Sequence, residues 1–119
     1  MKKKGKVLLI TPNLKGMKDG LNRIQPPLGP MIAANVIRNR YGHEVYMHDT
    51  ALEGWDNQQD KGENSVLIGQ TNEQIAEAIG SIDPDVIGIS ALFSNLMDSA
   101  HNIARITKKV SPKAKVVLG

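Results

Sequence analysis

Four short apolar runs divide the chain into strand-like segments, separated by longer stretches with helical spacing. The runs occupy residues 6–11, 43–50, 83–92 and 115–119. A short apolar run between turn signals is typical of a strand that is buried on both faces, as in a parallel sheet. We predict that the third run, DPDVIGISAL, is the central strand, because Pro84 prevents a helix from entering it.

Three segments between these runs are predicted to be helices. The first opens at PPLGP and ends at Gly42, the second begins with a Thr71–Gln74 capping box, and Pro112 stops the third. Apolar positions at helical spacing define the expected buried faces. For the first helix they are Leu28, Met31, Ile32, Val36 and Ile37; for the second, Ile75, Ile79 and Ile82; for the third, Leu96, Ala100, Ile103, Thr107 and Val110.

Two long connections, residues 14–25 and 51–69, show no convincing period and are predicted to be loops. Loops of this length are uncommon within a compact domain, and many of them carry function. The second loop holds Trp55, and its apolar end, residues 66–68, is expected to pack as a short edge segment.

The alternation of strands and helices predicts an α/β fold with a flavodoxin-like or Rossmann-like parallel sheet in the order 2-1-3-4, flanked by helices. A fifth strand and helix usually complete such a domain, and they are missing here. We therefore expect residues 1–119 to be one domain, truncated at its C-terminus, of a larger protein. Ligands of open α/β sheets bind beyond the carboxyl ends of the strands, so Ser90, Ala91 and Leu92 are placed at that crevice.

Composition removes several classes of function. The chain has no cysteine, which excludes disulfides and iron–sulfur clusters within it. It has no apolar run long enough to span a membrane and no signal peptide, so we expect a cytoplasmic protein. Lys2, Lys3 and Lys4 supply much of the net charge of +3, and the remaining charges are of mixed sign, which argues against a nucleic-acid partner.

The familiar catalytic motifs are missing as well. No Gly-x-Gly-x-x-Gly or Walker A motif follows the first strand, and the three histidines lack the spacing of metal ligands. Ser90, His48 and Asp49 could be assembled into a triad, but Ser90 lacks the Gly-x-Ser-x-Gly elbow. We predict neither catalytic nor metal-ligating residues in this chain.

The order of elements, together with PPLGP, HEVYMHDT, PDVIGISAL and KVVLG, resembles the cobalamin (vitamin B12)-binding domain at the amino end of many radical S-adenosylmethionine enzymes. The resemblance covers about residues 5–119. It implies cobalamin as the cofactor and a C-terminal radical S-adenosylmethionine domain of the same parent chain as the partner. S-adenosylmethionine and a 4Fe-4S cluster would belong to that missing part. The parent would be a methyltransferase or a rearranging enzyme, and this chain alone would not be catalytic.

The resemblance also implies a set of cofactor-binding residues. The family's Ser-x-Leu motif, which lines the slot for the nucleotide tail of cobalamin, matches Ser90-Ala91-Leu92. The family's glycine pair after the fourth strand is represented by Gly119. Residues 49–55, beginning with Asp49 and Thr50, would form a second wall with polar contacts to the corrin amides.

One departure from the wider cobalamin family concerns the lower ligand of cobalt. Mutases and methionine synthases carry Asp-x-His-x-x-Gly after the first strand. When the glycine is placed on Gly29, Ile24 and Pro26 stand where Asp and His would be. The resemblance therefore implies binding without a lower histidine, with Ile24 and Gln25 near the cobalt face.

The residues leave an alternative open. A flavodoxin-like structural or interaction domain, or a sensor of another small ligand, could use the same crevice without binding cobalamin. A Cys-x-x-x-Cys-x-x-Cys motif downstream in the parent gene would favour the cobalamin interpretation.

Overall fold

The computed structural model of the chain describes residues 5–18, 28–90 and 97–118, and the side chains of residues 28–30 are outside this description. Its main feature is a four-stranded parallel sheet in the order β3-β1-β6-β7. The strands are β1 (Lys6–Thr11), β3 (Glu44–Asp49), β6 (Val86–Ile89) and β7 (Lys115–Leu118). This is the predicted order 2-1-3-4, and the α/β class is confirmed.

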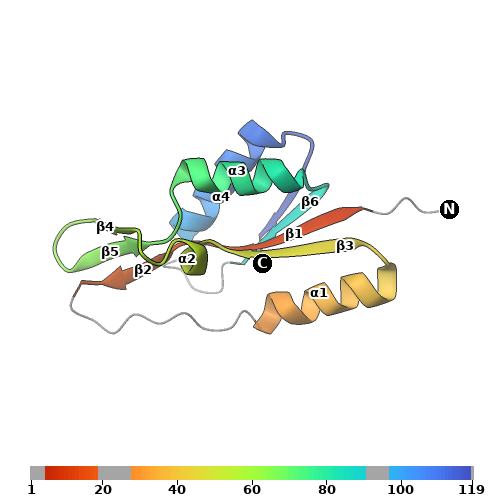
Figure 1. Cartoon of the computed structure of the whole chain (residues 1–119), viewed down its shortest axis with the longest axis horizontal. Helices are drawn as coiled ribbons and strands as arrows, with labels where there is room; N and C mark the ends of the chain where they lie inside the picture. Colours follow the sequence, from red (N-terminus) through yellow and green to blue (C-terminus); the bar gives the residue numbers. More distant parts are fainter. Residues whose placement is uncertain (1–4, 19–27, 91–96, 119) are drawn as a thin grey trace.

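Helices cover the two faces of this sheet unequally (Figure 1). On one face lie α3 (Asn72–Ile82) and α4 (Met97–Val110), whereas α1 (Leu28–Tyr41) runs along β3 on the other face. The core lies under α3 and α4. Its members are Leu8, Ile10, Ile75, Ile79, Ile87, Ile89, Ala100, Ile103 and Ile106.

Local signals in the sequence account for the helix boundaries. Thr71 Oγ1 accepts a hydrogen bond from Gln74 N at 3.2 Å, and Gln74 Oε1 accepts one from Thr71 N at 2.9 Å. This is the predicted capping box at the start of α3. At the end of α1, Gly42 has a φ of +71°, which glycine adopts without steric cost.

The predicted buried face of α1 is wrong at three of its five positions; Ile37 is half-buried, and the side chain of Leu28 lies outside the described residues. Met31, Ile32 and Val36 are 48%, 66% and 42% exposed, whereas Ala34 is buried. The helix is apolar on most of its circumference, so the spacing does not select one face.

A smaller correction concerns α4. Val110, in its last turn, is 38% exposed, and Ile106 occupies the core instead. The expected core residue Leu96 lies outside the described residues.

Both predicted loops contain regular structure. Residues 14–17 form β2 (Leu14–Met17), and the second loop contains α2 (Thr50–Glu53), β4 (Gln58–Asp60) and β5 (Ser65–Ile68). The three strands make an antiparallel sheet in the order β2-β5-β4, called the small sheet below. Residues 66–68 therefore belong to its central strand, not to an edge segment. One partner strand, β2, lies about fifty positions away in the sequence, and the other, β4, consists of the polar residues QQD, so the local pattern did not reveal the sheet.

Candidate functional site

The carboxyl ends of β1, β3 and β6 bring three polar residues to one edge of the parallel sheet. Thr11 and Asp49 are paired in register, and Ser90 N donates a hydrogen bond to Ile10 O at 3.0 Å. Ser90 is partly exposed. The strand order reverses between β1 and β6, so Ser90 lies at the position where open α/β sheets bind ligands.

Asp49 and Thr50 have structural roles at this edge. Asp49 Oδ1 accepts hydrogen bonds from Ala51 N and Leu52 N, both at 3.1 Å, and so caps α2. Thr50 is fully buried, and its hydroxyl donates to Thr11 O at 2.8 Å. Thr50 thus ties the ends of β1 and β3 together. The half-buried Asp49 remains a predicted cofactor contact.

A polar network at Gln70 fixes the start of α3 against the same edge. Gln70 N donates to Thr50 O at 3.1 Å, and Asn13 Nδ2 donates to Gln70 O at 2.9 Å. The side chain of Gln70 is 2.6 Å from His48 Nε2. Sequence reasoning missed Asn13 and Gln70. The Pro12-Asn13 pair directly after a buried strand was the one local signal for them.

Two glycines allow this network to close. A Cβ at Gly54 would be 2.2 Å from Gln70 N, and a Cβ at Gly69 would be 1.8 Å from Asn13 Oδ1. Gly69 also has a φ of +146°, a conformation that other residues rarely adopt. Asn13 is buried, and within the described structure its Oδ1 has no hydrogen-bond partner. The close approach of Gly54 to the backbone of Gln70, and of Gly69 to the Asn13 side chain, therefore fixes the connection between β5 and α3.

An apolar row crosses the sheet face that carries α1. Met47, Leu9, Gly88 and Val117 are neighbours in register on β3, β1, β6 and β7. The side chain of Leu9 leans over Gly88, since a Cβ there would lie 2.9 Å from Leu9 Cδ2. The space over Gly88 is therefore occupied by a side chain of the neighbouring strand.

This row is only partly covered, and Ser90 lies beside it on the same face. Val117 is 49% exposed and Met47 is 41% exposed. Side chains alternate along a strand, so Ser90, two residues after Gly88, continues the same face. An apolar floor with a hydroxyl beside it suits a flat heteroaromatic ring with a polar edge, and the residues present fit such a group.

Several predicted site residues lie outside the described part of the chain. They are Ile24, Gln25, Ala91, Leu92 and Gly119. Gly29 is in the first turn of α1. Of the Ser-x-Leu motif, only Ser90 can be placed.

Neither a metal site nor a membrane span is found within the described ranges. They contain no group of three or more His, Cys, Asp or Glu side chains arranged to hold a metal ion. No helix within them has both the length and the apolar character needed to cross a bilayer.

Comparison with known proteins identifies the family. A model of the B12 binding domain matches residues 15–119. The chain is 34% identical over 116 residues to cytidylyl-2-hydroxyethylphosphonate methyltransferase of Streptomyces wedmorensis, covering 96% of the chain and 22% of that protein. It is 29% identical over 113 residues to the uncharacterized methyltransferase PH0819 of Pyrococcus horikoshii, covering 95% of the chain and 21% of the relative. No solved structure matches significantly. The chain spans about a fifth of the length of these relatives, and it belongs to the B12-binding domain family.

Proposed function

We propose that this chain is the cobalamin-binding module of a radical S-adenosylmethionine methyltransferase, and that it binds the corrinoid without a lower histidine ligand. Family membership supports cobalamin as the ligand. The observation that carries the binding mode is the apolar row together with Ser90, which lies on the same face two residues after Gly88, at the reversal of strand order between β1 and β6.

In this proposal the nucleotide tail lies along the row formed by Leu9, Gly88 and Val117. The apolar floor would remove the heteroaromatic base from water, and the Ser90 hydroxyl would hydrogen-bond to the polar edge of that base. Asp49, in the wall beside β3, would face the corrin amides. Thr50 would act as a positioning residue, because its hydroxyl holds the end of β1.

The positions of the histidines support binding without a lower ligand. Residues 1–42 contain no histidine. His43 Nδ1 accepts a hydrogen bond from Gly5 N at the amino end of the sheet, the edge opposite to Ser90. His48 is held by Gln70 and pairs with Ile10, which faces the α3–α4 core. His101 lies on α4. No histidine of the described chain thus projects from the Ser90 side of the crevice.

When bound, cobalamin would supply a cobalt centre that can carry a methyl group. The residues of this chain would bind and orient it and keep water from its tail. Both relatives are named as methyltransferases and are about five times as long as the matched segment. A further domain of such a parent would hold the 4Fe-4S cluster and S-adenosylmethionine, which this cysteine-free chain does not ligate through thiolates.

The test is retention of hydroxocobalamin after gel filtration of the chain. We expect a coloured protein fraction, and we expect Ser90→Trp to lose the colour, because the indole would fill the tail slot. Ser81→Trp is the matched control, since Ser81 is an exposed residue of α3. Retention by both variants would contradict the slot. A colourless wild-type fraction would favour the alternative, a structural or ligand-sensing domain of the same fold.

A further inference from the structure

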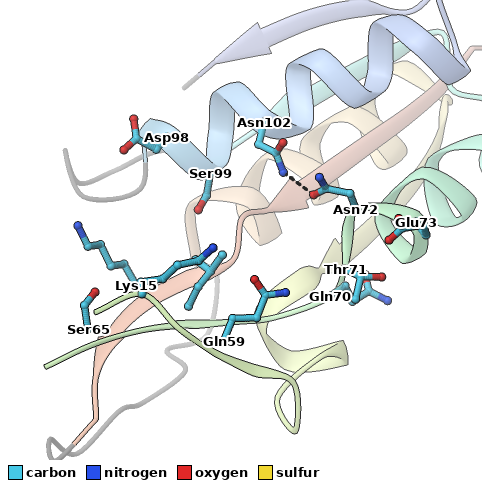
Figure 2. Close-up of a pocket in the computed structure, with 12 residues that line it drawn as sticks. Lys15, Gln59, Ser65, Gln70, Thr71, Asn72, Glu73, Asp98, Ser99 and Asn102 are labelled. Carbon is cyan, nitrogen blue, oxygen red and sulfur yellow. Dashed lines mark hydrogen bonds between the residues drawn. The ribbon is translucent and has the colours of Figure 1, made fainter. Parts of the chain in front are cut away.

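A cavity of about 590 Å³ lies between the small sheet and the first turns of α3 and α4 (Figure 2). It is on the α3–α4 side of the parallel sheet, whereas the apolar row and Ser90 are on the α1 side. The two sites therefore do not share a face. The lining residues used below are Lys15, Lys61, Ser65 and Ser99.

The burial of the opposite face of the small sheet forces these side chains toward the cavity. Val66 and Ile68 of β5 are buried, at 5% and 0% exposed. Alternation along the strand then turns Ser65 and Leu67 to the other side. Lys15 pairs in register with Leu67, so it shares that side. Lys61 follows on the β4 edge, where its N–H donates to Ser65 O at 3.1 Å.

The two lysines on this side of the small sheet have no negatively charged partner among the described residues. Within the described residues, neither Lys15 nor Lys61 forms an ion pair, whereas Lys18 Nζ lies 2.6 Å from Asp60 Oδ1. Between them, Ser65 Oγ is buried and has no hydrogen-bond partner in the described structure. A buried hydroxyl without a partner costs free energy, and a bound group that accepted its hydrogen bond would remove that cost.

The opposing wall is the start of α4, a helix of 14 residues. Its first N–H groups have no partner within the helix and carry partial positive charge. Figure 2 shows Ser99 pointing toward the small sheet and Lys15, while the Asp98 carboxylate points away from them. Glu73 lies on α3, at the far end of the cavity from Ser99. The region between Lys15, Ser65 and Ser99 thus presents donors and positive charge.

We infer that this part of the cavity binds a phosphate-type oxyanion, with Lys15 and Lys61 as the charged ligands and Ser65 and Ser99 as hydroxyl donors. Ammonium and hydroxyl groups converging on one point are the usual protein ligands of phosphate. The phosphate would belong to a separate phosphorylated molecule, because the nucleotide tail of cobalamin, with its phosphodiester, is proposed to lie on the α1 face. The site goes beyond the proposed function and does not depend on the Ser90 slot.

The test is a titration of the ¹⁵N-labelled chain with inorganic phosphate, followed by amide NMR at constant pH and ionic strength. We expect saturable shifts at Lys15, Ser65 and Ser99. Lys15→Gln and Lys61→Gln should each raise the Kd at least fivefold, while Lys108→Gln, in the exposed last turn of α4, should leave it unchanged. Equal effects in all three variants, or the same shifts with chloride, would overturn the inference.

Ser65→Ala separates binding from folding. It removes an unpartnered hydroxyl, so stability should be unchanged or higher, but phosphate should bind more weakly. Unchanged phosphate affinity would remove Ser65 from the site. Repeating the titration with hydroxocobalamin present identifies the source. Competition would place the phosphodiester of the cofactor in this cavity and would contradict the tail slot on the α1 face, whereas no competition would assign the site to a separate phosphorylated molecule. Both of these results support an oxyanion site.

Discussion

Replacing Gly69 by alanine should strongly destabilise the protein, because the new methyl group has no space. Its Cβ would lie 1.8 Å from Asn13 Oδ1 and 2.2 Å from Asn13 Cγ. The Asn13 side chain would have to move, which would break its 2.9 Å hydrogen bond to Gln70 O. The φ of +146° at Gly69 adds backbone strain for any L side chain.

The size of the effect follows from these terms. A positive φ at a non-glycine residue costs about 1–2 kcal/mol. Overpacking a closely packed site costs about 1–3 kcal/mol, and a lost hydrogen bond adds about 1 kcal/mol. Gly69→Ala should therefore lower the free energy of unfolding by at least about 3 kcal/mol. With a urea m-value of about 2 kcal/mol/M, the midpoint should fall by about 1.5 M.

Urea denaturation followed by circular dichroism measures this, with two other glycines as controls. Gly80 lies inside α3 and has open space around its Cβ position, so Gly80→Ala should stabilise the protein by about 0.5–1 kcal/mol. Gly62 has open space but a φ of +91°, so Gly62→Ala should cost about 1 kcal/mol. If Gly69→Ala costs no more than Gly62→Ala, the close approach to Asn13 is not what fixes this connection.

Three further predictions test other parts of the fold. Thr50→Val should cost about 1–3 kcal/mol in urea denaturation, because it removes the hydrogen bond from the Thr50 hydroxyl to the Thr11 carbonyl at the end of β1; a neutral effect would contradict the positioning role. Ile79→Ala should cost about 2–5 kcal/mol, whereas Ile32→Ala, at a residue 66% exposed, should cost under about 1 kcal/mol; equal costs would contradict the exposed face of α1. The hydrogen bond from Lys18 lowers the pKa of the Asp60 carboxyl below its usual 3.8, with a further bond from Gly62 N. The stabilisation from this pair should be complete above the unfolded-state pKa of Asp60 and should be lost as pH falls through its folded-state pKa. In an NMR titration, the pKa of Asp60 should be higher in Lys18→Met than in the wild-type chain.

The parallel sheet could be predicted from the sequence because each of its strands is a short apolar run that can be recognised without its partners. The buried runs, the capping box at Thr71 and the glycine at position 42 act over a few residues. The small sheet could not be predicted in the same way. β4 is three exposed polar residues, QQD, and β2 pairs with β5 across about fifty positions of sequence. Because α1 is apolar on most of its circumference, its sequence likewise did not show which side faces the sheet.

The candidate site was predictable as a location but not as a network. Because ligands of open α/β sheets bind at the carboxyl ends of the strands, the position of Ser90 directly after a buried apolar run is enough to place it at that edge. The contact between Asn13 and Gln70 spans 57 positions, and no local pattern encodes it. The cavity proposed to bind an oxyanion is formed in part by the small sheet. Because the small sheet could not be predicted from local pattern, the cavity could not be predicted either.

The most direct test of the central claim is an electron paramagnetic resonance spectrum of the chain loaded with cob(II)alamin and freed of excess cofactor. The proposal predicts that cobalt stays with the protein and that its spectrum lacks the superhyperfine splitting caused by an axial nitrogen. A spectrum with nitrogen splitting would show that a histidine or the tail base ligates cobalt, which would contradict the proposed binding mode. Loss of the cofactor during purification would contradict the binding itself.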